Sequence, residues 1–318
     1  MTDDAVLNER LSTALADVTV EPGARRAFVG PTVLRTDSAR ALRAQLSDAL
    51  YATLHAGHGA HRARPSGEQP RARTVRDHDF EARLARCVPH RHTRARGVLL
   101  GTSARGPIVR LADVTVLLSQ EQVVGTLPAP GHTVDLVLDA ARPVLSPGFF
   151  YVHGSRLTLL DGPVRRVYLH ITTASAAPGI LATTVAVLER RQARYHLKVL
   201  SAPDGFPRRD ALVIYLPPDG EAMAQHVAAA LTGHPGIGSD TSVLAAPLAP
   251  GVCTAWEPSD PRAGMRGMSF GQHRSFAIAE GLVAHATDPS PGHRAAAVAH
   301  ALRAADIDPL EPARNLSG

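Results

Sequence analysis

The sequence predicts an α+β protein in which a mixed β-sheet is flanked by helices and the C-terminal half is α/β-like. Two patterns support this fold class. Short stretches of strand-like alternation recur along the chain, and in the second half they alternate with segments of helical spacing. The chain has 318 residues, 44% hydrophobic and 20% charged, a composition typical of folded globular proteins.

The first half, residues 1–145, is expected to form a helical and β-containing region with an Arg/His-rich loop over residues 57–96. Helical spacing covers Asp4–Ala16 and Ser38–His55, and leucines recur at every fourth position in the second of these segments. Asp79–Cys87 is a further short helix. The predicted strands are Gly97–Leu100, Ile108–Leu111, Val114–Leu118 and Thr133–Leu138.

The second half, residues 146–318, has a more regular alternation of strands and helices. Its predicted strands are Phe149–Val152, Val164–Ile171, Tyr195–Leu200, Ala211–Leu216, Val243–Ala246 and Val252–Trp256. Its predicted helices are Ala176–Arg191, Asp219–Leu231, Ser269–His285 and His293–Ala305. Neither GxGxxG nor GxxxxGK[ST] follows any strand, so dinucleotide-binding and nucleoside-triphosphate-binding folds have no support.

The basic residues are almost all arginine, and Lys198 is the single lysine. A coding bias towards Arg, Ala, Gly and Pro explains most of this usage. Arginines concentrate over residues 61–105, where the preferred interpretation is a solvated surface and the alternative is a site for an acidic partner. Aromatic residues are only 4% of the chain and no nucleic-acid-binding module is present, so a nucleic-acid partner is not expected.

Other features indicate a cytoplasmic protein without a membrane partner. The N-terminus is acidic and lacks the basic and apolar regions of a signal peptide. No stretch approaches the ~18–20 apolar residues of a membrane span. Cys87 and Cys253 are far apart and form no CxxC pattern, so neither a disulfide framework nor a structural zinc site is expected.

Lys198 lies in the middle of a predicted strand, where alternation places it on the same face as His196. A lysine in a sheet is partly desolvated, which lowers its pKa and lets it act as a base. An arginine stays protonated and does not serve this purpose. This gives a chemical reason for one lysine among arginines, and the alternative is an edge-strand lysine left by chance.

The preceding strand alternates in the same way and places Arg166, Tyr168 and His170 on one face. If the two strands are neighbours with matching faces, these residues line one polar surface together with His196 and Lys198. Such a surface indicates a site in a sheet covered by helices. The alternative is the solvated side of an ordinary antiparallel sheet.

A third signal begins at Ser269, which with Gln272 forms a capping-box pattern at a helix start. A helix N-terminus can bind phosphate, Arg274 can clamp it, and His273 is a possible proton donor. The alternative is a capped helix that buries its apolar side. Arg209 precedes Asp210, and the two can form a local ion pair.

Two kinds of chemistry have no support. The histidines at positions 55, 58, 61, 78, 90 and 92 fit no closed zinc pattern, so no metal is expected. Neither cysteine has a neighbouring base, so cysteine-based acyl transfer is not indicated.

Several of these segments, in this order, resemble the HopA-type effector family. They are Ser146-Pro147-Gly148-Phe149-Phe150-Tyr151, Arg166-Val167-Tyr168, Leu197-Lys198-Val199-Leu200, Arg209-Asp210-Ala211 with Tyr215, Pro-Leu-Ala-Pro-Gly at 247–251, and Ser269-Phe270-Gly271 with His273-Arg274. The resemblance covers about residues 145–285 and makes residues 146–318 a HopA-like catalytic core. In the first half, only Leu50-Tyr51 and His55-Ala56-Gly57 are similar. His170 departs from the family, which commonly has an amide there.

The arginine bias favours the actinobacterial branch, which resembles the lyase component of class V lanthipeptide synthetases. The resemblance implies a phosphothreonine/phosphoserine lyase that eliminates phosphate from a precursor peptide phosphorylated by a partner Ser/Thr kinase, leaving dehydrobutyrine or dehydroalanine. No cofactor is required. The oligomeric state is not indicated.

Under this resemblance, Lys198 is the base and His273 the acid, with His196 as the rival acid. Tyr168 positions the peptide or stabilises the enolate-like intermediate. The phosphate cradle consists of Arg166, Arg209, Arg274 and the Ser269 helix start. The alternatives are a non-catalytic module of the same fold that binds peptide or kinase, and an effector-like protein.

Overall fold

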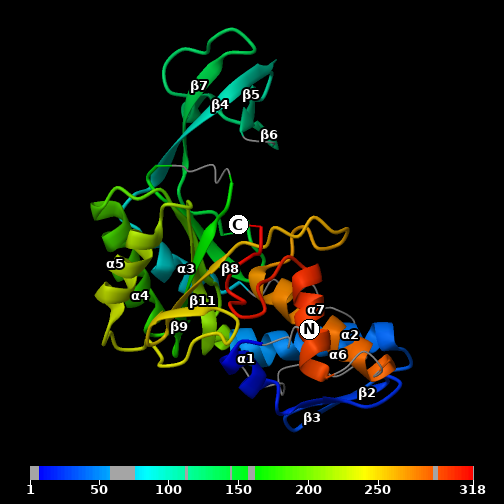
Figure 1. The fold of residues 1–318 in the computed structure, drawn as a ribbon. Helices are drawn as coiled ribbons and strands as arrows, with labels where there is room; N and C mark the ends of the chain where they lie inside the picture. Colours follow the sequence, from blue (N-terminus) through cyan, green and yellow to red (C-terminus); the bar gives the residue numbers. More distant parts are fainter. Residues whose placement is uncertain are drawn as a thin grey trace.

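The computed structural model describes residues 7–57, 76–111, 114–143, 145–156, 162–288 and 293–317. The predicted α+β class is confirmed. The described residues form a six-stranded central sheet, a four-stranded sheet and a three-stranded sheet, together with helices (Figure 1). Every ladder between these strands is antiparallel, which corrects the predicted mixed sheet.

The central sheet has the strand order β12-β13-β9-β11-β10-β8. Its strands are β8 (Phe149–His153), β9 (Arg165–Ile171), β10 (His196–Leu200), β11 (Arg208–Leu216), β12 (Ala246–Ala249) and β13 (Val252–Trp256). Helix α4 (Ala177–Arg190) connects β9 to β10, two strands that the sequence indicates as possible neighbours. Instead, β11 lies between these two strands and pairs antiparallel with both.

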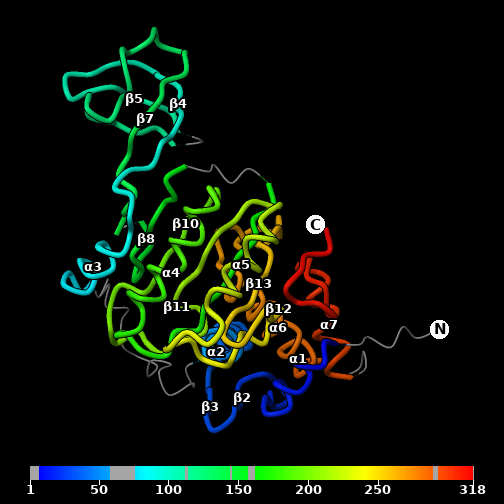
Figure 2. The backbone as a smooth tube through the Cα atoms, turned by 90° about the vertical axis from the view of Figure 1, so that its left-hand side faces the viewer, coloured from blue at the N-terminus to red at the C-terminus, as the bar shows by residue number. Residues whose placement is uncertain are grey.

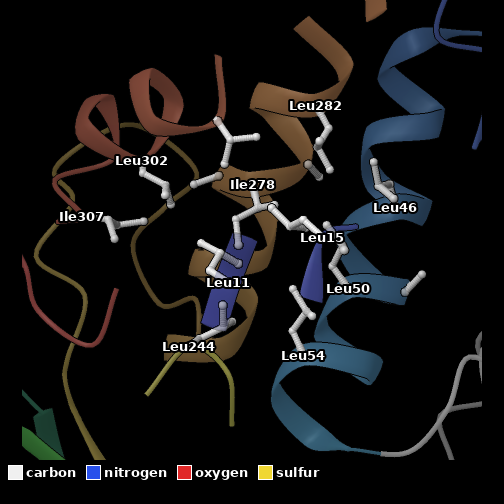
Figure 3. Close-up of a cluster of buried hydrophobic side chains, with 14 of the residues drawn as sticks. Leu11, Leu15, Leu46, Leu50, Leu54, Leu244, Ile278, Leu282, Leu302 and Ile307 are labelled. Atoms are coloured by element: carbon white, nitrogen blue, oxygen red, sulfur yellow. The ribbon is translucent and has the colours of Figure 1, made fainter. Parts of the chain in front are cut away.

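The two faces of the central sheet are covered by different helices (Figure 1). Apolar side chains of α3 (His78–Ala85), α4 and α5 (Glu221–Leu231) pack against one face. The other face packs against the hydrophobic cluster formed by α1 (Glu9–Ala14), α2 (Ala39–Leu50), α6 (Phe270–Thr287) and α7 (Arg294–Ala304). Figure 3 shows leucines of the N-terminal helices in contact with Ile278 and Leu282 of α6. The N-terminal helices therefore share a core with the C-terminal half.

The four-stranded sheet projects from this body, as Figures 1 and 2 both show. It consists of β4 (His92–Ser103), β5 (Gly106–Leu111), β6 (Val114–Leu117) and β7 (Thr133–Asp139) in the order β6-β5-β4-β7, with the short 3-10 helix η3 (Gln120–Gln122). All four strands were predicted, although β4 begins within the predicted loop over residues 57–96. Residues 58–75 of that loop lie outside the described residues.

Other predictions differ from the structure in detail. The hairpins of β1 (Val18–Val20), β2 (Arg26–Val29) and β3 (Thr32–Arg35) were not predicted, because each strand is only three or four residues long. The strand predicted over 243–246 begins at Ala246 instead and continues through a proline, as an edge strand can. A 3-10 helix, η4 (Pro203–Gly205), precedes β11.

No helix in the described ranges combines the length and apolar character needed to cross a membrane. Cys87 and Cys253 are both free thiols.

Candidate functional site

The predicted polar surface exists on the face of the central sheet that turns towards α6. Strand register places Arg166, Tyr215, His196 and His153 side by side across four strands. The next row contains Tyr168, Val213, Lys198 and Tyr151. The structure thus brings together four of the five residues predicted for this surface: Arg166, Tyr168, His196 and Lys198.

Lys198 is the unpaired cation of this face. Its Nζ lies 4.3 Å from the centroid of the Phe149 ring and makes no hydrogen bond or ion pair with any described residue. Burial, followed by the nearby Arg166 guanidinium, lowers the pKa of Lys198 to about 8. A substantial fraction of this amine is therefore neutral slightly above neutral pH.

Two arginines flank this amine, and each is already paired with a carboxylate. Arg166 is buried, holds Glu257 through two hydrogen bonds and lies 5.0 Å from the Tyr215 ring centroid. Arg208 pairs with Asp210 through two hydrogen bonds of 2.7 Å, and its Cζ lies 6.0 Å from the Phe149 ring. Each arginine is neutralised by its own carboxylate. Lys198 therefore carries the uncompensated charge among the described side chains of the site.

Arg208 was not among the predicted site residues, although Arg209 was. A register shift in β11 between Arg208 and Leu212 breaks the two-residue alternation, which would otherwise place Arg209 and not Arg208 on the face of Tyr215. The structure places Arg209 away from Lys198. Its Nη1 donates to the Thr53 carbonyl at 3.1 Å, and its Nη2 lies 3.8 Å from an oxygen of Asp240.

His170 lies with Arg209 at the same end of the sheet and not beside Lys198. Its Nδ1 is 3.1 Å from the Asp240 carbonyl oxygen. A side chain at Gly238 would collide with the His170 ring. The contacts of His170 are therefore with the 238–240 loop.

His196 lies among aromatic rings. Its ring centroid is 4.6 Å from that of Tyr215, 5.3 Å from that of Tyr151 and 6.0 Å from that of His153. Burial lowers the pKa of His196 to about 3, so the ring is neutral near neutral pH. Tyr151 and Tyr215 were not predicted as site residues, although alternation on β8 and β11 could have identified both.

A π-helical turn, η1 (Tyr51–Ala56), covers part of this face and follows α2 directly. Its Tyr51 hydroxyl donates to Asp210 and accepts from Arg208, so the turn supports the Arg208–Asp210 pair. Such turns occur often at functional sites. A Cβ on Gly271 would lie 2.3 Å from the His55 ring, which explains the glycine after Ser269-Phe270.

Tyr168 lies beneath this turn and is 1% exposed. The His55 ring meets it edge-on at 5.0 Å, and the Phe270 ring lies 5.9 Å away. Its hydroxyl lies near the Arg166 guanidinium but makes no hydrogen bond of normal geometry to a described residue. Tyr168 therefore lies under the site, where it can support Arg166.

Ser242, His55 and Asp210 have the order of a hydrolase triad, but they do not form a reactive one. The His55 ring is 2.9 Å from the Ser242 hydroxyl and 3.8 Å from Asp210. Ser242 is completely buried, and its oxygen accepts the Leu244 N–H. These residues join η1 to the sheet and leave the serine without access to a substrate.

The predicted helix start at Ser269 is confirmed, with both hydrogen bonds of the capping box. His273 and Arg274, on the first turns of α6, are buried. One His273 ring nitrogen contacts Asp260 and the other contacts Arg274, each at 2.9 Å. Both ring nitrogens of His273 are therefore occupied.

The guanidinium of Arg274 holds the C-terminal segment. It donates to the carbonyls of Pro312 and Arg314 and to the Asn315 side chain. The Asn315 amide in turn donates to the Glu257 carbonyl. The contacts of Arg274 therefore join α6 to the chain end and, through it, to the residue that holds Arg166.

Metal-binding geometry was not found: among the described residues, no group of three or more His, Cys, Asp or Glu side chains is arranged to hold an ion.

Comparisons with known proteins agree with the resemblance seen in the sequence. The model of the HopA1 effector protein family matches residues 140–314. The effector protein from Pseudomonas syringae pv. tomato strain DC3000 is 20% identical with a TM-score of 0.42, over 52% of this chain and 62% of that chain. The chain thus spans less than two thirds of that structure.

A second solved structure, the effector protein from Pseudomonas syringae pv. syringae strain 61, is 13% identical with a TM-score of 0.49. This similarity covers 87% of this chain and 92% of that chain. No curated protein shows a significant match to the chain.

Proposed function

The chain belongs to the HopA1 effector protein family, and within that family we propose that it is a phosphothreonine/phosphoserine lyase. It eliminates phosphate from a phosphorylated precursor peptide in lanthipeptide biosynthesis, and a partner Ser/Thr kinase supplies the phosphate. The observation that carries this proposal is the Lys198 amine, which is desolvated, unpaired and flanked by two arginines on a polar sheet face.

The elimination needs a base for the Cα proton of the phosphorylated residue. The neutral Lys198 amine takes this proton, the C–H electrons form the Cα=Cβ bond, and the Cβ–O bond breaks to release phosphate. Arg166 and Arg208 both lower the pKa of Lys198, so they oppose the rise in this pKa that a bound phosphate dianion would cause.

The leaving phosphate needs cationic partners. Arg166 and Arg208 are the arginines nearest to Lys198, and we assign the phosphate to them. In this arrangement, Arg209, Arg274 and the Ser269 helix start lie outside the cradle, because their contacts are with Thr53, with the C-terminal segment and with Gln272, away from Lys198.

We assign the proton donor to His196, the rival of His273. His273 is 1% exposed and both of its ring nitrogens are engaged. The His196 ring lies on the same face as Lys198, two residues away along β10. A bound phosphate dianion favours the protonated imidazolium and so raises the pKa of His196 from its low value in the free protein.

The test is incubation with a synthetic phosphothreonine peptide, followed by mass spectrometry. Wild type is expected to release phosphate and leave dehydrobutyrine. Lys198→Ala is expected to be slower by about 100-fold or more. Lys198→Arg is expected to fail equally, because a guanidinium stays protonated, whereas the exposed Arg303→Ala serves as the unaffected control.

Two results would each contradict a different part of the proposal. Unchanged turnover by Lys198→Ala would remove Lys198 as the base. Tight binding of the phosphopeptide by wild type without any elimination would instead indicate a non-catalytic peptide-binding module.

A further inference from the structure

Two adjoining cavities lie on the opposite edge of the central sheet from Lys198, next to strand β12. The larger, of about 550 Å³, is enclosed by the β12–β13 hairpin, α1 and the C-terminal segment. The smaller, of about 370 Å³, shares Trp256 and Arg314 with it. Figure 2 shows α1, β12 and β13 close to the end of the chain. Together the cavities form one groove, lined by both apolar and charged side chains.

Arg165 is the central cation of this groove. Its guanidinium lies 4.3 Å from the Trp256 ring centroid, and the side chain is only 12% exposed. One nitrogen donates to Glu221, whose own side chain is 72% exposed. The Nε of Arg165 is buried and has no acceptor among the described residues. Since a buried donor without an acceptor is costly, this group is suited to a ligand oxygen.

The remaining charges of the groove are also weakly compensated. Arg10 donates to the Ala245 and Ser242 carbonyls and the Thr241 hydroxyl, and it contacts no carboxylate of a described residue. Arg314 pairs with Glu311, and both side chains are 59% exposed, so this ion pair contributes little. The two linings contain three arginines and three glutamates, and one of the glutamates, Glu257, is paired with Arg166. A small excess of positive charge therefore remains, which favours an anionic ligand.

The groove is connected to the Lys198 face by adjacent residues. Arg165 faces the groove, whereas Arg166, the next residue of β9, belongs to the polar face. Glu257 lines the smaller cavity and holds Arg166. A chain bound along the groove would thus lead towards the Arg166–Glu257 pair.

We propose that this groove binds an acidic, extended segment of the peptide substrate, away from the residue that reacts. β12 is the edge strand of the described sheet, so one side of its backbone pairs with no described strand and can pair with an extended peptide. Prolines and Trp256 supply apolar contacts, and the arginines select carboxylates. This proposal rests on the proposed function, because it assumes a peptide substrate.

Trp256 is the single tryptophan of the chain, so its fluorescence reports on the groove. The probe is a synthetic peptide of alternating leucine and glutamate, and its counterpart with glutamine in place of glutamate is the control. The acidic peptide is expected to change the emission in a saturable way and to bind at least about tenfold more tightly than the control. Added salt is expected to weaken its binding.

Variants separate this proposal from the proposed function. Arg165→Met is expected to weaken the acidic peptide at least about tenfold, with the exposed Arg314→Met as a second, fold-sparing variant of smaller effect. Lys198→Ala is expected to leave the titration unchanged even though elimination is lost. Equal binding of both peptides, or binding of ATP as tight as that of the acidic peptide, would overturn the groove assignment and leave the lyase proposal standing.

Discussion

Two polar regions lie on either side of Tyr168, and they differ in how their cations are satisfied. On the sheet face, the Lys198 amine has an aromatic ring beside it and no hydrogen bond or ion pair within the described ranges. At the start of α6, Arg274 is fully buried and donates to two carbonyls and a side-chain oxygen. Both regions contain residues that the sequence indicates as functional.

Burial of a charged side chain therefore does not by itself indicate a site. A cation whose donors are all occupied stabilises the fold and has nothing left for a ligand. A desolvated amine without partners destabilises the fold, but its lowered pKa makes it reactive. The network of His273 and Arg274 belongs to the first kind, and Lys198 belongs to the second.

Arg274→Met gives the largest expected effect on stability. It leaves the Pro312 and Arg314 carbonyls and the Asn315 side chain without their donor. Each acceptor left unsatisfied costs about 1 to 3 kcal/mol, so the free energy of unfolding is expected to fall by about 3 to 5 kcal/mol. Urea denaturation measures this change. Lys198→Met is the matched control, because removing an unpaired buried cation is expected to leave stability equal or higher. A smaller loss of unfolding free energy for Arg274→Met than for Lys198→Met would contradict the structural role of Arg274.

Regular strands made the sheet face predictable. Two-residue alternation on β9 and β10 correctly placed Arg166, Tyr168, His196 and Lys198 on one face, because neither strand is interrupted. Arg208 was not predicted, because it reaches this face only through the irregularity of β11. Local pattern carries no information on such a shift.

Long-range contacts were the other part that the sequence did not reveal. The helix start at Ser269 was predicted from local spacing and confirmed. However, the partners of Arg274 lie about forty positions later, in the C-terminal segment. The π-helical turn that brings His55 over the sheet likewise depends on tertiary packing against Gly271.

The next largest effect is the pH dependence of stability, to which the buried His55 contributes. Burial lowers its pKa to about 4, whereas an unfolded chain has a histidine pKa of about 6.5. The unfolded state therefore binds more protons between pH 4 and 6.5, and stability falls as the pH decreases through this window. The loss is about 1.4 kcal/mol per pH unit for this histidine, and up to about 3 kcal/mol in total.

His55→Gln is expected to make unfolding free energy less dependent on pH over the same window, as measured by urea denaturation at each pH. His153 and His196 also have lowered pKa values, so they keep part of the slope in the variant. An unchanged slope in His55→Gln would show that the pKa of His55 is not lowered in the folded protein, which would contradict this prediction.

The pH dependence of turnover is a smaller effect, and it tests directly whether the Lys198 amine is the reactive cation. If the neutral amine is the base and bound phosphate keeps His196 protonated, turnover of a phosphothreonine peptide is expected to rise about tenfold per pH unit up to about pH 8. The groups that act on this amine are Arg166, Arg208, Asp210 and Glu257.

Because Lys198 is the single lysine, NMR of protein labelled with 13C-lysine gives one side-chain signal that can be titrated without assignment. Its midpoint is expected near pH 8. A midpoint near the ordinary lysine value of about 10.4 would show a solvated ammonium and remove the reason for assigning it as the base.

Ser269→Ala gives the smallest expected effect and tests the phosphate role of the helix start. The substitution removes the hydroxyl that accepts the Gln272 N–H, and the free energy of unfolding is expected to fall by about 1 kcal/mol. If this end of α6 acts only as a capped helix, kcat and KM of elimination stay unchanged, whereas Ser269→Asp restores stability because aspartate is an equally good cap. If the helix start instead holds phosphate, the aspartate variant raises KM through charge repulsion despite its restored stability, and the α6 start then joins the sheet face as part of the site.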